Sequence, residues 1–176
     1  MDTVLISLFV IMILLFSVLT LTESYVRVQD NLAVSWKQME KRAGEQARTH
    51  LTVVRADSLS AGAALDITLR NSGSVKLTDF AEWDVIIQHY DLTGDYLIDW
   101  YDYRESGLTL GGEWTVEGIY VVAATEASEV FDPGILNPGE EIVIRTQLSS
   151  PMNTDSVGVA TVSTWNGITA SAVFTR

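Results

Sequence analysis

The chain has 176 residues, with 23 acidic and 11 basic side chains and a formal net charge of −12. Its length suits one membrane helix and one domain of ordinary size, and the absence of cysteine excludes disulfides, thiolate metal sites and cysteine nucleophiles. An acidic chain lacks the Lys and Arg surplus that neutralises phosphates, so no nucleic acid is expected as a partner.

Residues 3–22 form a run of twenty residues without a charge, TVLISLFVIMILLFSVLTLT. As an α-helix the run would be about 30 Å long, which matches the hydrocarbon thickness of a bilayer. Its apolar side chains cover every face, so the helix needs lipid or other apolar helices on all sides. The run predicts either a plain membrane anchor or a helix that lies first in lipid and later in the core of a helical filament.

The filament reading assigns the contacts between copies to large apolar side chains of this run. The candidate core-interface residues are Val4, Leu5, Leu8, Phe9, Met12, Ile13, Phe16 and Leu19. The run lacks the basic start and small-residue cleavage site of a secretory signal. Basic residues follow it, which by the positive-inside rule would keep the rest of the chain in the cytoplasm. This conflicts with the strand-rich pattern of the later residues, which is typical of a surface domain. We therefore hypothesise that a short basic leader is removed ahead of the run.

Residues 23–48 continue the helical pattern but are amphipathic. No Pro or Gly interrupts them before Gly44. One apolar stripe recurs at steps of three or four residues, the spacing of one helical face; its members are Tyr25, Val28, Leu32, Trp36 and Met39. We therefore expect one helix over residues 1–48, with a stripe that packs on the rest of the chain or on neighbouring copies.

From residue 49 onward the periodicity changes to two, which indicates β-strands. The expected strands cover residues 49–56, 64–70, 76–80, 83–90, 95–103, 114–123, 141–148, 157–165 and 168–175. Asn166-Gly167 is a hairpin signal between the last two, because both residues tolerate positive φ. Short strands with regular turns predict an antiparallel immunoglobulin-like β-sandwich over residues 49–176, and hence an α+β chain.

The expected sandwich is strongly acidic, since residues 56–176 carry a net charge of −13 and residues 1–55 carry +1. Its aromatic residues are expected to fill the core or to anchor an interface; they are Trp83, Trp100, Trp114, Tyr120, Phe131, Trp165 and Phe174. His50 and His89 stand alone and are expected on strand surfaces. No HExxH, GxGxxG, GxxxxGK or GxSxG pattern occurs, so the chain is not expected to be an enzyme or to need a cofactor.

One acidic cluster is a candidate for Ca²⁺. Asp91, Thr93 and Asp95 surround a short turn and offer carboxylate and hydroxyl oxygens, the ligands that this cation prefers. The spacing and the terminal bidentate Glu of an EF-hand are missing. The alternative is that these acidic residues lie on the solvent face of a hairpin.

The most distinctive part of the expected sandwich is residues 131–144, FDPGILNPGEEIVI. Its Pro133-Gly134 and Pro138-Gly139 pairs predict two turns ahead of an alternating strand. Together with the apolar helix and its extension, the LNPGE turn and the closing hairpin resemble archaellins, the archaeal-type flagellins, and more widely the type IV pilin superfamily. The resemblance implies a leader cut just before the helix, a helix in a filament core and a β-sandwich outside.

Two features depart from that resemblance. Bacterial type IV pilins have a glutamate at the fifth mature position, where this chain has Leu5, so the archaellin branch is favoured. Archaellins commonly carry N-linked glycans, whereas Asn71, Asn153 and Asn166 here all lack the Asn-X-Ser/Thr pattern. N-glycosylation at the usual motif is therefore not expected.

Three functions remain open from the sequence. The first is a subunit of an extracellular archaellum-like filament, made of many copies and held in the cytoplasmic membrane before assembly. The second is a single-copy anchored sandwich of the archaellum stator type, which contacts a cell-envelope layer. The third is an adhesive pilus subunit.

Overall fold

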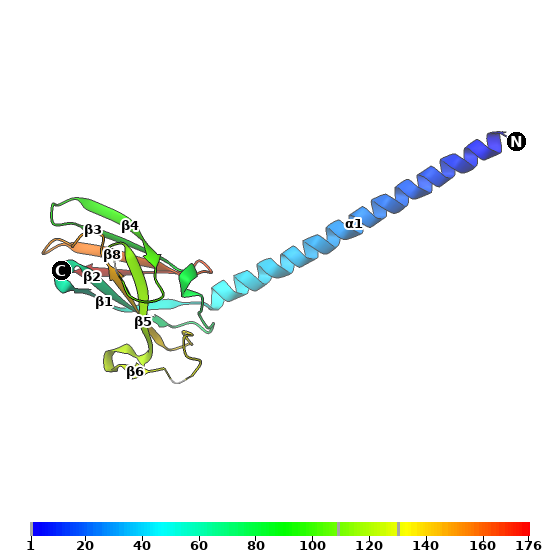
Figure 1. The fold of residues 1–176 in the computed structure, drawn as a ribbon. Coiled ribbons are helices and arrows are strands. Elements are labelled where there is room, and N and C mark those ends of the chain that lie inside the picture. The colour runs from blue at the N-terminus through cyan, green and yellow to red at the C-terminus, as the bar shows by residue number, and fades with distance from the viewer. Residues whose placement is uncertain (1, 109, 130) are drawn as a thin grey trace. The chain divides into compact units, whose positions relative to one another are not determined.

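The computed structural model describes residues 2–108, 110–129 and 131–176, and the chain divides into two compact units between Gly44 and Glu45 (Figure 1). Helix α1 covers Asp2–Arg48. The strands that follow are β1 (Leu51–Leu59), β2 (Ala64–Asn71), β3 (Asp84–Tyr90), β4 (Tyr96–Tyr103), β5 (Glu113–Val122), β6 (Ala127–Ser128), β7 (Glu141–Gln147), β8 (Val157–Ser163) and β9 (Thr169–Thr175). Short 3-10 turns occupy Ser60–Gly62, Phe80–Glu82 and Ala123–Thr125.

The strands form a sandwich of two layers. One layer has the order β1-β2-β7-β5, with β6 on β5, and the other has the order β4-β3-β8-β9. These orders are those of the immunoglobulin fold with one additional edge strand, β4. All pairings are antiparallel except a short parallel one, in which Asp102 and Tyr103 of β4 meet Glu113 and Trp114 of β5. The predicted α+β class, a long helix followed by an immunoglobulin-like sandwich, is confirmed.

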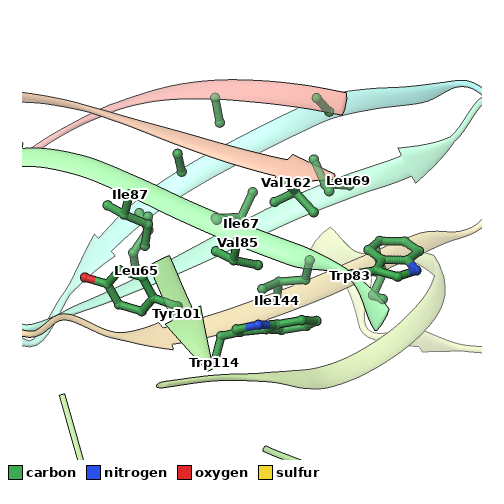
Figure 2. Close-up of a cluster of buried hydrophobic side chains, with 14 of the residues drawn as sticks. Leu65, Ile67, Leu69, Trp83, Val85, Ile87, Tyr101, Trp114, Ile144 and Val162 are labelled. Atoms are coloured by element: carbon green, nitrogen blue, oxygen red, sulfur yellow. The ribbon is translucent and has the colours of Figure 1, made fainter. Parts of the chain in front are cut away.

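Alternation of side chains along each strand builds the core between the layers (Figure 2). Leu65, Ile67 and Leu69 of β2 point inward and are fully buried. They meet Val85 and Ile87 of β3 from the opposite layer (Figure 2). The ring of Tyr103 packs edge-on against Trp114 at a centroid distance of 4.8 Å, where β4 crosses to β5.

The LNPGE sequence forms a turn ahead of β7. The Glu140 N–H donates to the Asn137 carbonyl at 3.1 Å, and Gly139 has φ +90°. This is the geometry that Pro-Gly at the two central positions favours. The Glu140 carboxylate accepts hydrogen bonds from the backbone and side-chain nitrogens of Asn137. Both the backbone and the side chain of Glu140 therefore bind Asn137 across the turn.

Two strand assignments differ from the sequence prediction. Residues 76–80 do not form a strand: Leu77 makes a single bridge to Leu136, and Phe80 begins a 3-10 turn. The apolar pattern there reflects the burial of one side chain, Leu77, under a loop. Strand β6 escaped prediction because two residues are too few to show a period of two.

The aromatic residues divide between core and surface. Trp83, Trp114 and Phe174 are buried. Tyr120 is half-buried. The core alternative was wrong for the exposed aromatics, which are Trp100, Phe131 and Trp165, and their role as interface anchors stays a prediction. In β4 the buried position belongs to the neighbouring Tyr101, and alternation then turns Trp100 outward.

The surface expectation for His89 was also wrong. His89 of β3 is fully buried, and its Nε2 lies 2.9 Å from the Ser150 carbonyl. His50 is exposed, as expected. The two histidines differ because His89 lies on the inward-facing parity of β3, which only the strand register determines.

Gly158 of β8 should be intolerant of substitution. A Cβ at this position would lie 2.4 Å from Cζ of Phe174, a ring that is buried in the core. We expect Gly158→Ala to lower the free energy of unfolding by about 1–3 kcal/mol because the core is overpacked. Denaturant unfolding followed by tryptophan fluorescence measures this. The control is Thr161→Ser on the outer face of the same strand, which keeps the hydroxyl that is hydrogen-bonded to Ser171 and should change stability by less than about 0.5 kcal/mol; equal effects would contradict the packing argument.

Candidate functional site

The apolar run of α1 is the first feature with a functional character. Its eight candidate core-interface side chains lie within one half of the helix circumference and are each more than half exposed in the single chain. The other half carries further exposed apolar side chains, which are Ile6, Val10, Leu14, Val18 and Leu21. Large apolar side chains on all sides of one helix require lipid or other apolar helices around them. Their assignment to contacts between copies stays a prediction.

Polar groups inside the run are satisfied by the helix itself. The hydroxyls of Ser7, Ser17 and Thr22 donate to carbonyls three or four residues earlier, at 2.8–2.9 Å. Such back-bonding removes the cost of burying a hydroxyl in an apolar medium. Within the described residues one helix, Thr3–Arg48, is long and apolar enough to cross a membrane.

Beyond the run, α1 is apolar on one side only. The stripe of Tyr25, Val28, Leu32, Trp36 and Met39 is exposed. The opposite face carries most of the charges of this segment: Glu23, Arg27, Asp30, Lys37 and Lys41. A helix with this division covers one side against an apolar partner and leaves the other in water.

The last turn of α1 belongs to the sandwich unit and is tied to the turn between β8 and β9. Gln46 Nε2 donates to the Asn166 carbonyl at 2.7 Å. Asn166 Nδ2 donates to Thr49 Oγ1, which in turn donates to the Glu45 carbonyl. Asn166-Gly167 therefore forms the predicted hairpin turn and also binds side chains at the end of the helix. Only Gly167 of the pair adopts positive φ.

A second turn holds the same segment from the β2 side. The Ser74 N–H donates to the Arg48 carbonyl, and the N–H groups of Ser72 and Gly73 donate to the His50 carbonyl. A Cβ on Gly73 would lie 2.4 Å from the Arg48 carbonyl oxygen, so only glycine fits there. The helix thus passes into β1 through two residues, 49 and 50, which are hydrogen-bonded on both sides.

The predicted calcium loop is a compact turn between β3 and β4. Oδ1 of Asp91 accepts hydrogen bonds from the Thr93 N–H, the Thr93 hydroxyl and the Asp95 N–H, at 2.7–2.9 Å. The Thr93 hydroxyl, aided by backbone N–H groups, lowers the pKa of Asp91 below its ordinary value. One carboxylate oxygen is therefore committed to the turn itself. In the described part of the chain, no group of three or more His, Cys, Asp or Glu side chains is arranged to hold a metal, and calcium binding stays a prediction.

No family model and no curated protein matches the chain. The solved structures that resemble it include the following three. The archaellum periplasmic stator protein FlaG from Sulfolobus acidocaldarius shows 23% identity over 72% of this chain and 99% of that chain, with a TM-score of 0.49. The periplasmic stator complex of FlaF and FlaG from the same organism shows 21% identity over 70% and 87%, with a TM-score of 0.49.

The third structure is the archaeal flagellum of Methanospirillum hungatei strain JF1, at 13% identity over 94% of this chain and 89% of that chain, with a TM-score of 0.53. The sandwich unit alone is about three quarters of the chain, so a match over 94% includes most of the helix as well. At these identities the likeness is one of fold.

The lowered pKa of Asp91 predicts a pH dependence. Its folded-state pKa lies below the unfolded value, so its contribution to stability is present above about pH 4 and is lost as the pH falls through the folded-state pKa. We expect the melting temperature of Asp91→Asn to fall less steeply than that of the native chain below about pH 4. Equal slopes of melting temperature against pH in the two proteins would contradict this.

Calcium is tested with the same pair of proteins. If the turn holds the ion through Asp91, calcium raises the melting temperature of the native chain and not of Asp91→Asn. An unchanged midpoint in the native chain would dismiss the site.

Proposed function

We propose that the chain is a structural subunit of an extracellular helical filament of the archaellum type, with α1 in the core and the sandwich in the outer shell. The observation that carries this proposal is the continuity of α1. A run that is apolar all round passes without interruption into an extension with one apolar stripe. The apolar surface is therefore longer than a single bilayer crossing needs.

In this role α1 lies in the cytoplasmic membrane before assembly and exchanges lipid for the helices of neighbouring copies afterwards. Contacts among apolar side chains hold the core without covalent links, since the chain has no cysteine. The net charge of −13 on residues 56–176 keeps the outer shell soluble. If the filament is archaellum-like, its rotation by a membrane motor drives swimming.

The likeness to the M. hungatei flagellum supports this proposal because it extends over the helix as well as the sandwich. The shared feature is the architecture of one long helix followed by a β-sandwich, the combination that lets a subunit contribute to a core and a shell at once. The proposed partner is accordingly other copies of the same chain.

A second candidate role is a membrane-anchored protein of the cell envelope, similar in design to an archaellum stator component. The length of the uncharged run favours it: residues 3–22 match one bilayer thickness, and charge returns at once with Glu23 and Arg27. In this role α1 stays in the bilayer and the sandwich contacts an envelope layer.

Charges introduced into the apolar run test the core assignment. We expect Leu8→Asp or Ile13→Asp to abolish fibres while the sandwich stays folded, because a carboxylate in a dry helix bundle has no partner. Electron microscopy of sheared cell surfaces measures fibres, and circular dichroism measures the sandwich. Leu8→Met is the matched control and should assemble normally. Normal fibres in the Asp variants would remove these residues from the core.

The extension separates the two roles more sharply, because it lies outside the membrane-length run. Leu32 lies on the apolar stripe and Val34 on the charged face, and both are more than half exposed. In a filament, Leu32→Asp should prevent assembly without blocking membrane insertion, whereas Val34→Asp should be tolerated. If both variants behave like the native chain, the anchored role is favoured.

The cellular readouts complete the test. Mass spectrometry of recovered fibres should identify this chain as their main component, and its absence from fibres would exclude a filament subunit. A deletion strain that keeps its fibres but does not swim would favour the stator role. Loss of fibres with unchanged swimming would instead indicate an adhesive pilus.

A further inference from the structure

Strand β4 has an unpaired edge at the end of its layer (Figure 1). One side of β4 pairs with β3 along its length, from Tyr90 with Tyr96 to Val85 with Tyr101. In the described part of the chain, the other side pairs only at Asp102 and Tyr103, with β5. Residues 96–100 are thus an edge without a neighbouring strand.

The backbone groups at this edge point outward at alternate residues. The Asp102 N–H donates to the Gly112 carbonyl on the β5 side at 2.9 Å. Because backbone direction alternates along a strand, the N–H and C=O groups of Tyr96, Ile98 and Trp100 point to the same side. They are available for another strand.

The side chains of these three residues are exposed and held in place. Ile98 is 61% exposed and Trp100 is 58% exposed. The Trp100 indole N–H donates to the Asp84 carboxylate at 2.9 Å, and the Tyr96 hydroxyl donates to Gln88 Oε1 at 2.9 Å. The Tyr96 ring also lies 4.9 Å from that of Tyr90. This apolar row is therefore ordered before any partner arrives.

Edges of sheets are normally protected by charged side chains, above all Lys, or by Pro or a bulge. β4 contains no Lys, Arg or Pro, and its register with β3 is unbroken. Its two charges are Asp99, which shares the inward parity of Tyr101 and accepts a hydrogen bond from the Ser149 hydroxyl, and Asp102, at the end that meets β5. The outer face of the other layer is closed by ion pairs instead: Arg145 bonds Asp66 at 2.8 Å and Glu117 at 3.0 Å, and Arg70 bonds Glu141. The sandwich thus has one face suited to water and one edge suited to a partner.

We propose that the β4 edge pairs with β4 of a second copy in a two-fold antiparallel ladder centred on Ile98. In this register Ile98 lies opposite itself, and Tyr96 lies opposite the second copy's Trp100. All three are positions whose backbone groups point outward, so the ladder forms about six hydrogen bonds. Aromatic pairs flank an aliphatic pair, an arrangement that stabilises antiparallel strands.

The sequence of β4 favours a second copy as the occupant because no Asp lies directly opposite another in this register, and Asp99 meets Asp99 of the second copy only diagonally. Asp99 lies opposite Leu97 of the second copy, and Asp95 lies opposite Tyr101. The ladder also fits the local chain path. The β3–β4 turn leaves the edge at Asp95, just before the position opposite Asp102, where β5 begins to occupy the same side.

The contact joins two four-stranded layers into one continuous sheet of two copies. It is isologous, so it closes at a dimer and does not propagate. Because the two sandwiches are strongly acidic, long-range repulsion opposes pairing at low salt and is screened at high salt. The dimer should therefore strengthen with ionic strength. The proposal rests on the sandwich alone, although a contact that closes at a dimer suits the anchored role better than a filament, whose contacts must propagate.

Cross-linking in the full chain tests the register, since the native chain has no cysteine. Ile98→Cys places two thiols opposite each other at a Cα separation of about 5.5 Å, which a disulfide can span. Under mild oxidation in detergent micelles we expect Ile98→Cys to form disulfide dimers. The control is Val173→Cys, a similarly exposed residue on β9, at the opposite end of the layer from β4. Equal cross-linking of both would show random collision or pairing through α1, and would overturn the proposal.

A charge at the edge provides the second test. Ile98→Lys should raise the dissociation constant of the dimer at least about tenfold, because two ammonium groups then meet at the centre of the ladder. Analytical ultracentrifugation in detergent measures this, with Val173→Lys as the matched control and thermal melting to verify folding. A native chain that stays monomeric at high salt, or a dimer that survives Ile98→Lys, would overturn the proposal.

Discussion

The constraint on which the structure depends is that the first twenty residues of α1 leave no side suited to water. Serine and threonine in this run bond back to the helix, so nothing in it opposes an apolar environment. Every proposed role follows from this need for cover. The filament and the anchored protein differ only in whether neighbouring helices or lipid provide it.

The sandwich covers its apolar side chains from water within one chain. Inward-facing residues of β2 and β3 cover each other, and the ion pairs of Arg145 and Arg70 close the outer face of the first layer. The β4 edge is one place where this closure stops, because β4 meets β5 over only two residues; the described strands β1 and β9, at the two ends of the strand order, share no ladder either. Unpaired backbone groups and exposed aromatic side chains coincide there.

Symmetry links the two proposals. Copies in a polar helical filament meet through heterologous contacts, which propagate, whereas pairing of β4 with itself is isologous and closes. A contact that closes at a dimer is more easily reconciled with an anchored protein than with a polar fibre. The state of the β4 edge therefore bears on the choice between the filament and the anchored role.

The sequence by itself determined the elements whose pattern is long and local. An uncharged run of twenty residues and an uninterrupted amphipathic stripe predict a helix, because a helix satisfies its own backbone hydrogen bonds in an apolar environment. Eight of the strands follow from alternation, and Asn166-Gly167 from turn chemistry. Local patterns also identified the Asp91 turn, although they could not reveal that its carboxylate is used within the turn itself.

Only the tertiary structure decided which side of each strand is inside. Trp100 and Tyr101 are adjacent and equally apolar in pattern, and a shift of one residue in register would exchange them. The same parity buries His89. Tertiary structure also made β4 an edge, because a strand is free or paired according to neighbours that come from distant parts of the chain, and no local pattern records them.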